Sequence, residues 1–228
     1  MKRVAIITVL IVLMAPTQAI SALSWSNNLL INPGAETGQL DPWTYGSHVV
    51  VSQSEEETTG WVYPHSGDWF FNMHGTKAGV LGSLVADAIY QDVDVSSYAV
   101  DIDAGMFMVQ AHTWLQTEDS DAFPTADYAQ LTVCFLNQSG VQIGALSTGL
   151  VQSPNLTWIE QTLDGRALVG TRTLRIELLG EMHEGTWINT FFDNASIKVA
   201  VVPAPGALLL GSVGTGLVVG WLRRRRAF

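Results

Sequence analysis

The sequence predicts an all-β fold, an antiparallel β-sandwich, for the central part of the chain. Three observations support this prediction. Several segments alternate apolar and polar residues, as strands with one buried face do. Turn-favouring glycine, asparagine, aspartate and serine residues stand between those segments. No long segment has the apolar spacing of a convincing amphipathic helix, so packed sheets must supply the core.

Five alternating segments define the predicted strands. They are residues 90–95, 105–117, 127–137, 173–179 and 191–199. The clearest turns are Asn-Gln-Ser-Gly at residues 137–140 and Asp-Gly at residues 164–165. All of these segments fall within residues 23–198, a suitable length for one domain.

The first 22 residues have the parts of a secretory signal peptide. Lys2 and Arg3 precede an apolar run over residues 4–14, and small residues around Ala19 and Ala22 offer cleavage sites. The alternative is an uncleaved membrane anchor, but this run is shorter than the roughly 20 residues that a bilayer requires. We therefore expect the chain to be exported.

The other end combines a proline-containing linker, an apolar helix and a basic tail. Residues 199–205 form the predicted linker, and its motif is Val202, Pro203, Ala204 and Pro205. Residues 206–222 contain no charge and would span roughly 25 Å as a transmembrane helix. Residues 223–228 are the predicted cytoplasmic tail, which begins with Arg223, Arg224, Arg225 and Arg226. By the positive-inside rule these arginines leave the acidic body on the far side of the membrane.

This C-terminal arrangement resembles the PEP-CTERM sorting signal of exopolysaccharide-producing Gram-negative bacteria. The resemblance implies that an exosortase-type enzyme processes the chain near the Pro-x-Pro motif, after which the body reaches the cell surface or the extracellular matrix. Ala204 stands where that family usually has glutamate. The alternative is an ordinary tail anchor that is never cut.

Charge and cysteine content exclude several classes of function. The formal net charge is -10, and all 21 acidic residues lie between Glu36 and Asp193, whereas six of the 11 basic residues stand at the two ends. Such an acidic body repels phosphate backbones, so we expect no nucleic-acid partner. Cys134 is the one cysteine, so the chain has no intramolecular disulfide and no thiolate zinc site.

Two passages at the ends of the body resemble signatures of the galactose-binding-like jelly roll, a fold that includes many carbohydrate-binding modules. The opening passage is Asn-Pro-Gly-Ala-Glu-Thr-Gly at residues 32–38, with Trp43 after it, and the closing passage is Phe-Asp-Asn-Ala-Ser-Ile at residues 192–197. A Ser-Gly turn at residues 66–67, a Gln-containing strand at residues 89–93 and Trp158 fall between them in the usual order. The resemblance implies a jelly-roll β-sandwich over residues 23–198.

The resemblance also implies a structural calcium ion that ties the first strand to the last, with Glu36 and Asp193 as ligands. Alternation along the last strand places Asp193 on the inward face, where an uncompensated carboxylate is costly. Calcium prefers hard oxygen ligands, carboxylates among them. In the alternative interpretation, Asp193 accepts hydrogen bonds from backbone amides or pairs with an arginine such as Arg175.

Two clusters have the residue types of a sugar-binding site, which combines an exposed aromatic ring with amide, histidine and carboxylate groups. The first requires strands 105–117 and 127–137 to pair as a hairpin with one shared face. That face would present Gln110, His112, Trp114, Tyr128 and Gln130. The second cluster is Trp61 and Tyr63 on a loop. In the alternative, Trp114 packs under a neighbouring loop and Trp61 closes the end of the sandwich.

Together these features predict an exported bacterial cell-surface protein that binds extracellular polysaccharide or matrix and catalyses no reaction. The sequence lacks metal-protease, nucleophile-elbow and phosphate-loop motifs, and the three glutamates at residues 55–57 are expected in a solvated turn. One alternative is a purely structural surface or matrix protein, in which Trp61 and Trp114 are buried. The other is a polysaccharide hydrolase, whose two carboxylates would converge in a cleft.

Overall fold

The computed structural model describes residues 23–46, 49–57, 60–73, 86–118, 127–153, 157–183 and 187–202. The predicted signal peptide (1–22), most of the sorting motif (203–205), the predicted transmembrane helix (206–222) and the basic tail (223–228) lie outside these residues. Within the described ranges, none of the helices is long and apolar enough to cross a membrane.

The described chain forms two five-stranded sheets and one two-stranded hairpin, and every strand pair is antiparallel. The first sheet has the order β1-β6-β11-β8-β9, the second has the order β10-β7-β12-β5-β2, and β3 pairs with β4. The strands are β1 (Thr44–Tyr45), β2 (Val50–Ser52), β3 (Glu55–Glu57), β4 (Gly60–Val62), β5 (Phe70–Asn72), β6 (Ala86–Asp94), β7 (Phe107–Thr117), β8 (Tyr128–Leu136), β9 (Gln142–Ser147), β10 (Ile159–Arg166), β11 (Thr173–Glu181) and β12 (Thr190–Val201).

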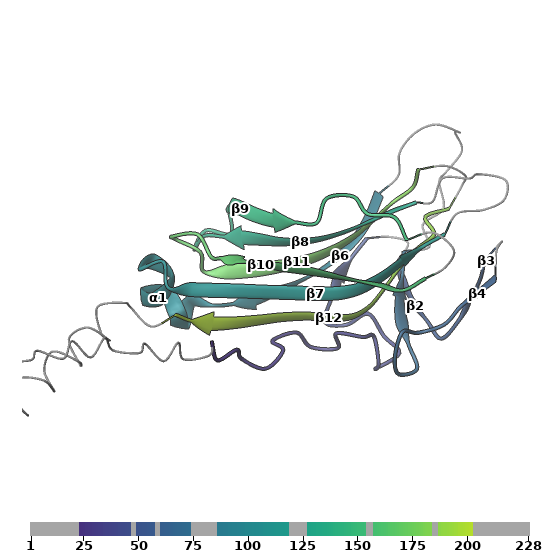
Figure 1. The fold of residues 1–228 in the computed structure, drawn as a ribbon, viewed down its shortest axis with the longest axis horizontal. Coiled ribbons are helices and arrows are strands. Elements are labelled where there is room, and N and C mark those ends of the chain that lie inside the picture. Colours follow the sequence, from purple (N-terminus) through teal and green to yellow (C-terminus); the bar gives the residue numbers. More distant parts are fainter. Residues whose placement is uncertain are drawn as a thin grey trace, which may run out of the picture.

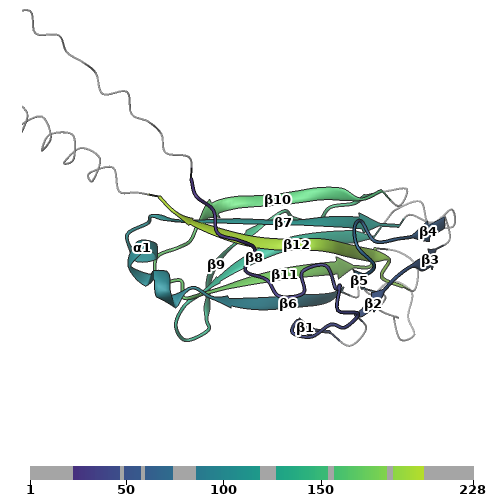
Figure 2. The same cartoon turned by 90° about the horizontal axis from the view of Figure 1, so that it is seen from below.

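The chain crosses repeatedly from one sheet to the other, which is the connectivity of a jelly roll. Strands β6, β8 and β11 belong to the first sheet, and the strands that alternate with them, β7, β10 and β12, belong to the second. A short 3-10 turn (Ser96–Tyr98) and helix α1 (Ala99–Asp103) lie at one end of the sandwich, and the β3–β4 hairpin lies at the opposite end (Figures 1 and 2). The predicted all-β antiparallel sandwich is confirmed.

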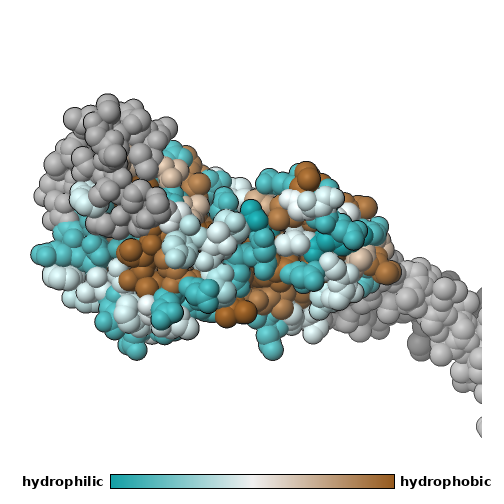
Figure 3. Space-filling view, turned by 180° about the vertical axis from the view of Figure 1, so that it is seen from behind, coloured by the Kyte–Doolittle hydropathy of each residue, from teal (hydrophilic) through white to brown (hydrophobic). Residues whose placement is uncertain are grey.

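The core lies between the inward faces of the two sheets, as the alternating sequence pattern predicts. Along β7, Phe107, Val109 and Ala111 are fully buried, whereas the residues between them are half-buried on the outer face. Leu131 and Val133 on β8 are fully buried in the same cluster, on the facing sheet. On the face shown in Figure 3, apolar residues form separate patches divided by polar ones.

The predicted hairpin of β7 with β8 is wrong. Strand β7 pairs with β10 and β12 in the second sheet, and β8 pairs with β11 and β9 in the first. Both strands have one apolar face, so they bury those faces against each other across the core instead of joining edge to edge. Their outer faces therefore point away from each other.

The two ends of the described body lie together on β12. The segment before β1 runs along the edge of this strand, where the Ser26 amide donates to the Val199 carbonyl and the Leu29 amide donates to the Ile197 carbonyl, both at 2.9 Å. Strand β12 continues to Val201, beyond the predicted domain boundary at residue 198, because its register with β7 extends to Phe107. The first three residues of the predicted linker are therefore strand.

We expect Asn28 to join the opening passage to the closing one. Its side-chain oxygen accepts the Ile197 amide at 3.0 Å and its amide nitrogen donates to the Ala195 carbonyl at 3.0 Å. The substitution Asn28→Ala should lower the free energy of unfolding by about 2 kcal/mol, since both backbone groups lose their partner. Asn27→Ala, at the exposed neighbouring position, should leave the urea midpoint unchanged. Equal midpoints for the two variants would contradict this assignment.

Candidate functional site

An exposed pair of aromatic rings projects from the β3–β4 end of the sandwich. Trp61 on β4 is 52% exposed, and Tyr63 immediately after β4 is 60% exposed. Their rings stack with centroids 6.5 Å apart and an interplanar angle of 25°. The sequence placed these residues on a loop, whereas Trp61 lies within a strand. We call the two side chains the aromatic platform.

Strand alternation explains how the platform is fixed. Val62, between the two exposed residues, is 1% exposed and packs in a small apolar cluster with Phe70, Phe191 and Trp158. The indole nitrogen of Trp158 donates to the Tyr63 carbonyl at 3.0 Å. The platform is therefore held in place by the buried Val62 side chain and by the hydrogen bond from Trp158 to the Tyr63 backbone.

A carboxylate lies next to the platform on the paired strand. Glu56 of β3 stands directly opposite Trp61 in the antiparallel register, so the two side chains share one face of the hairpin. Both are exposed. The hairpin thus combines two flat apolar rings with a hydrogen-bond acceptor.

Glu36 and Asp193 hold the segment that follows the platform. The Glu36 carboxylate accepts the backbone amides of Asp68 at 3.0 Å and Trp69 at 3.4 Å. Asp193 accepts the Ser66 amide at 3.0 Å. The sequence predicted that these two acids lie together, and the structure brings both against residues 66–69. We call this arrangement the carboxylate clamp.

The pKa of Asp193 is raised to about 6, mainly by burial and in smaller part by the charge of Glu36, while amide hydrogen bonds from Ser66 and Asn194 oppose the rise. Asp193 has no exposed surface. Arg175 does not pair with it, because its guanidinium binds Asp92 at 2.7 Å on the first sheet. Of the alternatives left open by the sequence, the structure shows the hydrogen bonds from backbone amides to Asp193.

The clamp also offers oxygen atoms to a cation. A Cβ placed on Gly34 would lie 3.0 Å from Asp193 Oδ1 and 3.6 Å from Glu36 Oε1, so both carboxylates face the Gly34 backbone. The two carboxylates retain lone pairs beyond those used by the amides, which fits the hard-oxygen preference of calcium. Within the described ranges, however, three or more His, Cys, Asp or Glu side chains never gather as a metal ligand set.

The Trp114 ring is covered by another side chain and is not available to a ligand at the surface. The ring of His65 stacks on it with centroids 3.9 Å apart and an interplanar angle of 13°, and Asn194 contacts the His65 ring nitrogen at 3.0 Å. Trp114 therefore packs under the loop after the platform, which is the alternative that the sequence left open.

The other residues of the first predicted cluster lie on two opposite outer faces. Gln110 and His112 are on β7, where Gln110 donates to Asp164 at 2.9 Å and burial lowers the pKa of His112. Tyr128 and Gln130 are on β8 in the other sheet, where Tyr128 packs edge-on against His183. The five residues do not form one surface, because the predicted hairpin does not exist.

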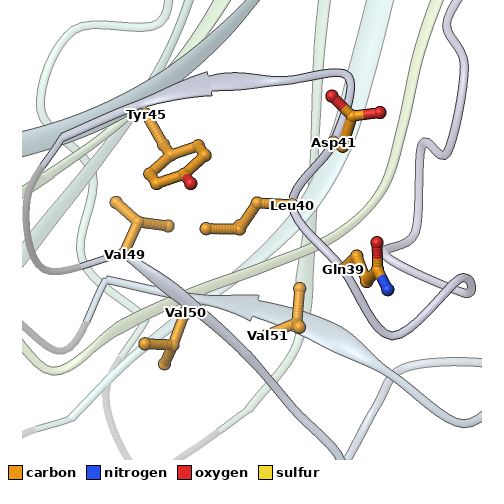
Figure 4. Close-up of a pocket in the computed structure, with 7 residues that line it drawn as sticks. All are labelled: Gln39, Leu40, Asp41, Tyr45, Val49, Val50 and Val51. Atoms are coloured by element: carbon orange, nitrogen blue, oxygen red, sulfur yellow. The ribbon is translucent and has the colours of Figure 1, made fainter.

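Sequence reasoning missed a shallow apolar groove beside β1 and β2. Its volume is about 540 Å³, and the lining residues are Gln39, Leu40, Asp41, Tyr45, Val49, Val50 and Val51 (Figure 4). Tyr45 is half exposed and its ring points toward Leu40 and Val49. The strands that form this groove have only two and three residues, too few to show alternation in the sequence.

No protein-family model matches the sequence, and no curated protein matches it either. Several solved structures resemble the structure of this chain. A cyclase from Fischerella sp. TAU has a TM-score of 0.54 at 11% identity, covering 79% of this chain and 100% of its own. The enzymatically active domain of tailspike protein 4 of bacteriophage CBA120 has a TM-score of 0.51 at 13% identity, covering 75% of this chain and 21% of its own.

Carbohydrate-binding modules are also among the similar structures. TmCBM61, solved in complex with beta-1,4-galactotriose, has a TM-score of 0.48 at 18% identity, with 75% of this chain and 98% of that chain covered. At such identities the two structures with TM-scores above 0.5 establish a shared fold and nothing finer.

The clamp predicts a contrast between two glycines. Gly67 and Gly140 both have positive φ, 72° and 74°, so an alanine costs about 1 kcal/mol of backbone strain at either position. A Cβ on Gly67 would overlap the Glu36 carboxylate, whereas a Cβ on Gly140 meets open space. Gly67→Ala should therefore lower the free energy of unfolding by about 2 kcal/mol more than Gly140→Ala, because two amide hydrogen bonds to Glu36 are lost.

Urea unfolding of both variants measures this difference. Equal losses of stability would show that Glu36 does not hold the loop.

Proposed function

We propose that this protein binds a polysaccharide without catalysing a reaction, and that the aromatic platform of Trp61 and Tyr63 is its binding surface. The observation that supports this proposal is the exposure of two stacked rings on a backbone that Val62 and Trp158 fix from below. A rigid platform loses little conformational entropy when a ligand binds.

The chemistry of the hairpin suits a sugar ligand. Sugar rings present flat C–H faces that pack on aromatic rings, and their hydroxyl groups require hydrogen-bond partners. Glu56 stands opposite Trp61 and can accept hydroxyl protons at the edge of the platform. An exposed aromatic pair beside an acid therefore favours a neutral polysaccharide over an anionic one, since the acidic body repels negative charge.

Burial of Asp193, one of the two paired carboxylates, supports a noncatalytic role. Glycoside hydrolysis requires two carboxyl groups that both reach the substrate. In the carboxylate clamp, Asp193 has no exposed surface and both acids are occupied by backbone amides. No observation in the described residues favours the hydrolase alternative. A purely structural role predicts a buried Trp61, and its exposure favours binding.

We also propose that the chain is exported and held at the cell surface, on the basis of the sequence of residues 1–22 and 199–228. In this arrangement an exosortase-type enzyme would process the C-terminal end. The C-terminal end of β12 lies on the side of α1, where the Val202 amide donates to the Met106 carbonyl, and the β3–β4 hairpin lies at the far end (Figures 1 and 2). An anchored body would therefore present the platform away from the membrane.

We expect Trp61→Ala to weaken polysaccharide binding about 30-fold. The physical reason is the loss of a stacking surface, for which truncation of a central aromatic residue costs about 2 kcal/mol. Affinity gel electrophoresis of the full-length protein against a panel of soluble polysaccharides measures this effect. The panel includes β-1,4-galactan and xylan, since galactotriose is the ligand in the TmCBM61 structure and xylan is the ligand named for a module of Paenibacillus barcinonensis.

Tyr45→Ala is the matched control for this experiment. Tyr45 is as exposed as Trp61 but lines the groove beside β1, so its loss should leave retardation in the gel unchanged. Weaker binding by Tyr45→Ala alone would move the binding surface to the groove. No retardation of the folded wild-type protein by any glycan would refute the proposal.

We further propose that Glu36 and Asp193 bind calcium. The negative charges of Glu36 and Asp193 repel each other. A cation bound between them would therefore stabilise the folded state. Calcium should therefore raise the melting temperature, and Asp193→Asn should reduce that rise. Differential scanning fluorimetry with calcium and with a chelator measures both effects. An identical calcium response in wild type and Asp193→Asn would overturn the assignment.

A further inference from the structure

Three chain connections meet at the α1 end of the sandwich, opposite the aromatic platform. They are residues 95–106 between β6 and β7, residues 137–141 between β8 and β9, and residues 167–172 between β10 and β11. The registers place them together, because Thr173 at the start of β11 stands opposite both Asp94 at the end of β6 and Leu136 at the end of β8. Strand β12 ends at the same place, where Val201 stands opposite Phe107 (Figures 1 and 2).

Each of these three connections exposes an aliphatic side chain. Val100 in α1 is 81% exposed, Val141 before β9 is 58% exposed, and Val169 between β10 and β11 is 67% exposed. Leu168 and Val201 beside them are exposed as well. We call these five side chains the apolar end. Connections that face water usually carry polar residues, so exposed aliphatic side chains on all three indicate a surface that contacts something other than water.

The five side chains are neighbours, because the connection between β10 and β11 lies between the other two. On one side, the Gly170 amide donates to Asp103 of α1 at 3.0 Å, and the guanidinium of Arg172 binds the same carboxylate at 2.7 Å. On the other side, a Cβ placed on Gly170 would lie 3.9 Å from the Ile143 side chain of β9. The exposed aliphatic groups therefore form one surface and are not scattered singly over the molecule.

The apolar end is nearly neutral, in contrast to the acidic body. The three connections, together with Asp94 and Arg166 beside them, contain three aspartates and two arginines. Asp103 is paired with Arg172, and the Arg166 side chain donates to the Gly105 carbonyl. Anionic lipid headgroups would therefore repel this end much less than they repel the rest of the body.

The chain leaves the described body at this same end. The Val202 amide donates to the Met106 carbonyl at 2.7 Å, which fixes residue 202 beside the connection that contains α1. The sequence predicts that residues 206–222 span a membrane, and residues 203–205 alone separate them from Val202. Because three residues extend at most about 10 Å, an anchored body has its apolar end close to the lipid.

We propose that the apolar end rests on the surface of the lipid bilayer in which the chain is anchored, with Val100, Val141 and Val169 inserted among the headgroups. A lipid surface removes separate aliphatic side chains from water without requiring a complementary shape. The contact would hold the body upright and direct the aromatic platform away from the membrane. This inference rests on the proposed anchoring of the chain and is independent of glycan binding.

Fluorescence quenching in vesicles tests the proposed contact. Full-length Val169→Cys is labelled with bimane and reconstituted in vesicles of phosphatidylethanolamine and phosphatidylglycerol with brominated acyl chains. Cys134 is buried, and wild-type protein treated with the same reagent measures any reaction there. We expect about a twofold loss of fluorescence relative to vesicles without bromine, because an apolar surface in such a contact lies about 5–10 Å into the headgroup and acyl boundary.

The control for position is Glu56→Cys, an exposed residue of the hairpin at the opposite end, whose label should not be quenched. Serine at Val100 and Val141 should weaken the quenching at residue 169, because the remaining surface binds lipid less strongly. Leu150→Ser is the matched control for these substitutions. Leu150 is an exposed aliphatic residue next to Val151, which bridges to Ala129 near the start of β8, far from α1.

Circular dichroism checks that each variant is folded, and a label on Val141→Cys replaces the one on Val169→Cys if that variant is not. Flotation of the vesicles distinguishes two kinds of failure. A chain that does not float with the vesicles would refute the proposed anchoring and this contact with it. A chain that floats while its label is quenched by iodide in solution and not by the lipid would overturn the contact alone. A label shielded from both quenchers would show that a protein covers this end, which would overturn the contact as well.

Discussion

The contact between two carboxylates and the amides of one loop determines how this end of the molecule is arranged. Glu36 comes from the opening passage and Asp193 from the last strand, and together they accept the amides of Ser66, Asp68 and Trp69. The same loop begins at the aromatic platform and places His65 over Trp114. Asp193 stands opposite Trp114, so its carboxylate lies on the outer face of β12 and is buried by this loop. A buried carboxylate requires such partners, because burial raises its pKa. One buried carboxylate thus holds the loop that begins at the exposed platform and covers Trp114.

Strand alternation in the sequence was sufficient to predict the long strands and their buried faces. The proximity of Asp193 to Glu36 followed from the opening and closing passages. The predicted inward position of Asp193 is wrong, because the register with β7 shifts between Asp193 and Ser196 and places Asp193 opposite Trp114 on the outer face. Sheet pairing did not follow, because β7 and β8 each have one apolar face, which is compatible both with a hairpin and with strands that face each other across the core. Seven of the twelve strands lie outside the five predicted segments, and several have only two or three residues, too few to show a period.

The same limitation applies to the candidate site. Periodicity shows that Trp114 points away from the core, but it cannot show whether another segment covers it, and the assignment of Trp61 and Tyr63 to a loop left their exposure equally open. Trp114 lies under His65, whereas Trp61 and Tyr63 have no such cover and remain more than half exposed. The glutamates at residues 55–57 illustrate the converse case, because a charged run suggested solvent exposure and the fold directs Glu57 inward toward Glu118. Tertiary packing, which no single segment encodes, decides both outcomes.

The indole N–H signals of the tryptophans provide the most direct measurement of glycan binding at the platform. The chain has eight tryptophans, and each gives one such signal in a proton–nitrogen NMR spectrum. Titration of the full-length protein with the polysaccharide that it binds should shift the Trp61 signal strongly. The signals of Trp43 and Trp158, whose indole nitrogens donate to backbone carbonyls, should move little. Saturable binding that leaves the Trp61 signal in place would contradict the proposed platform.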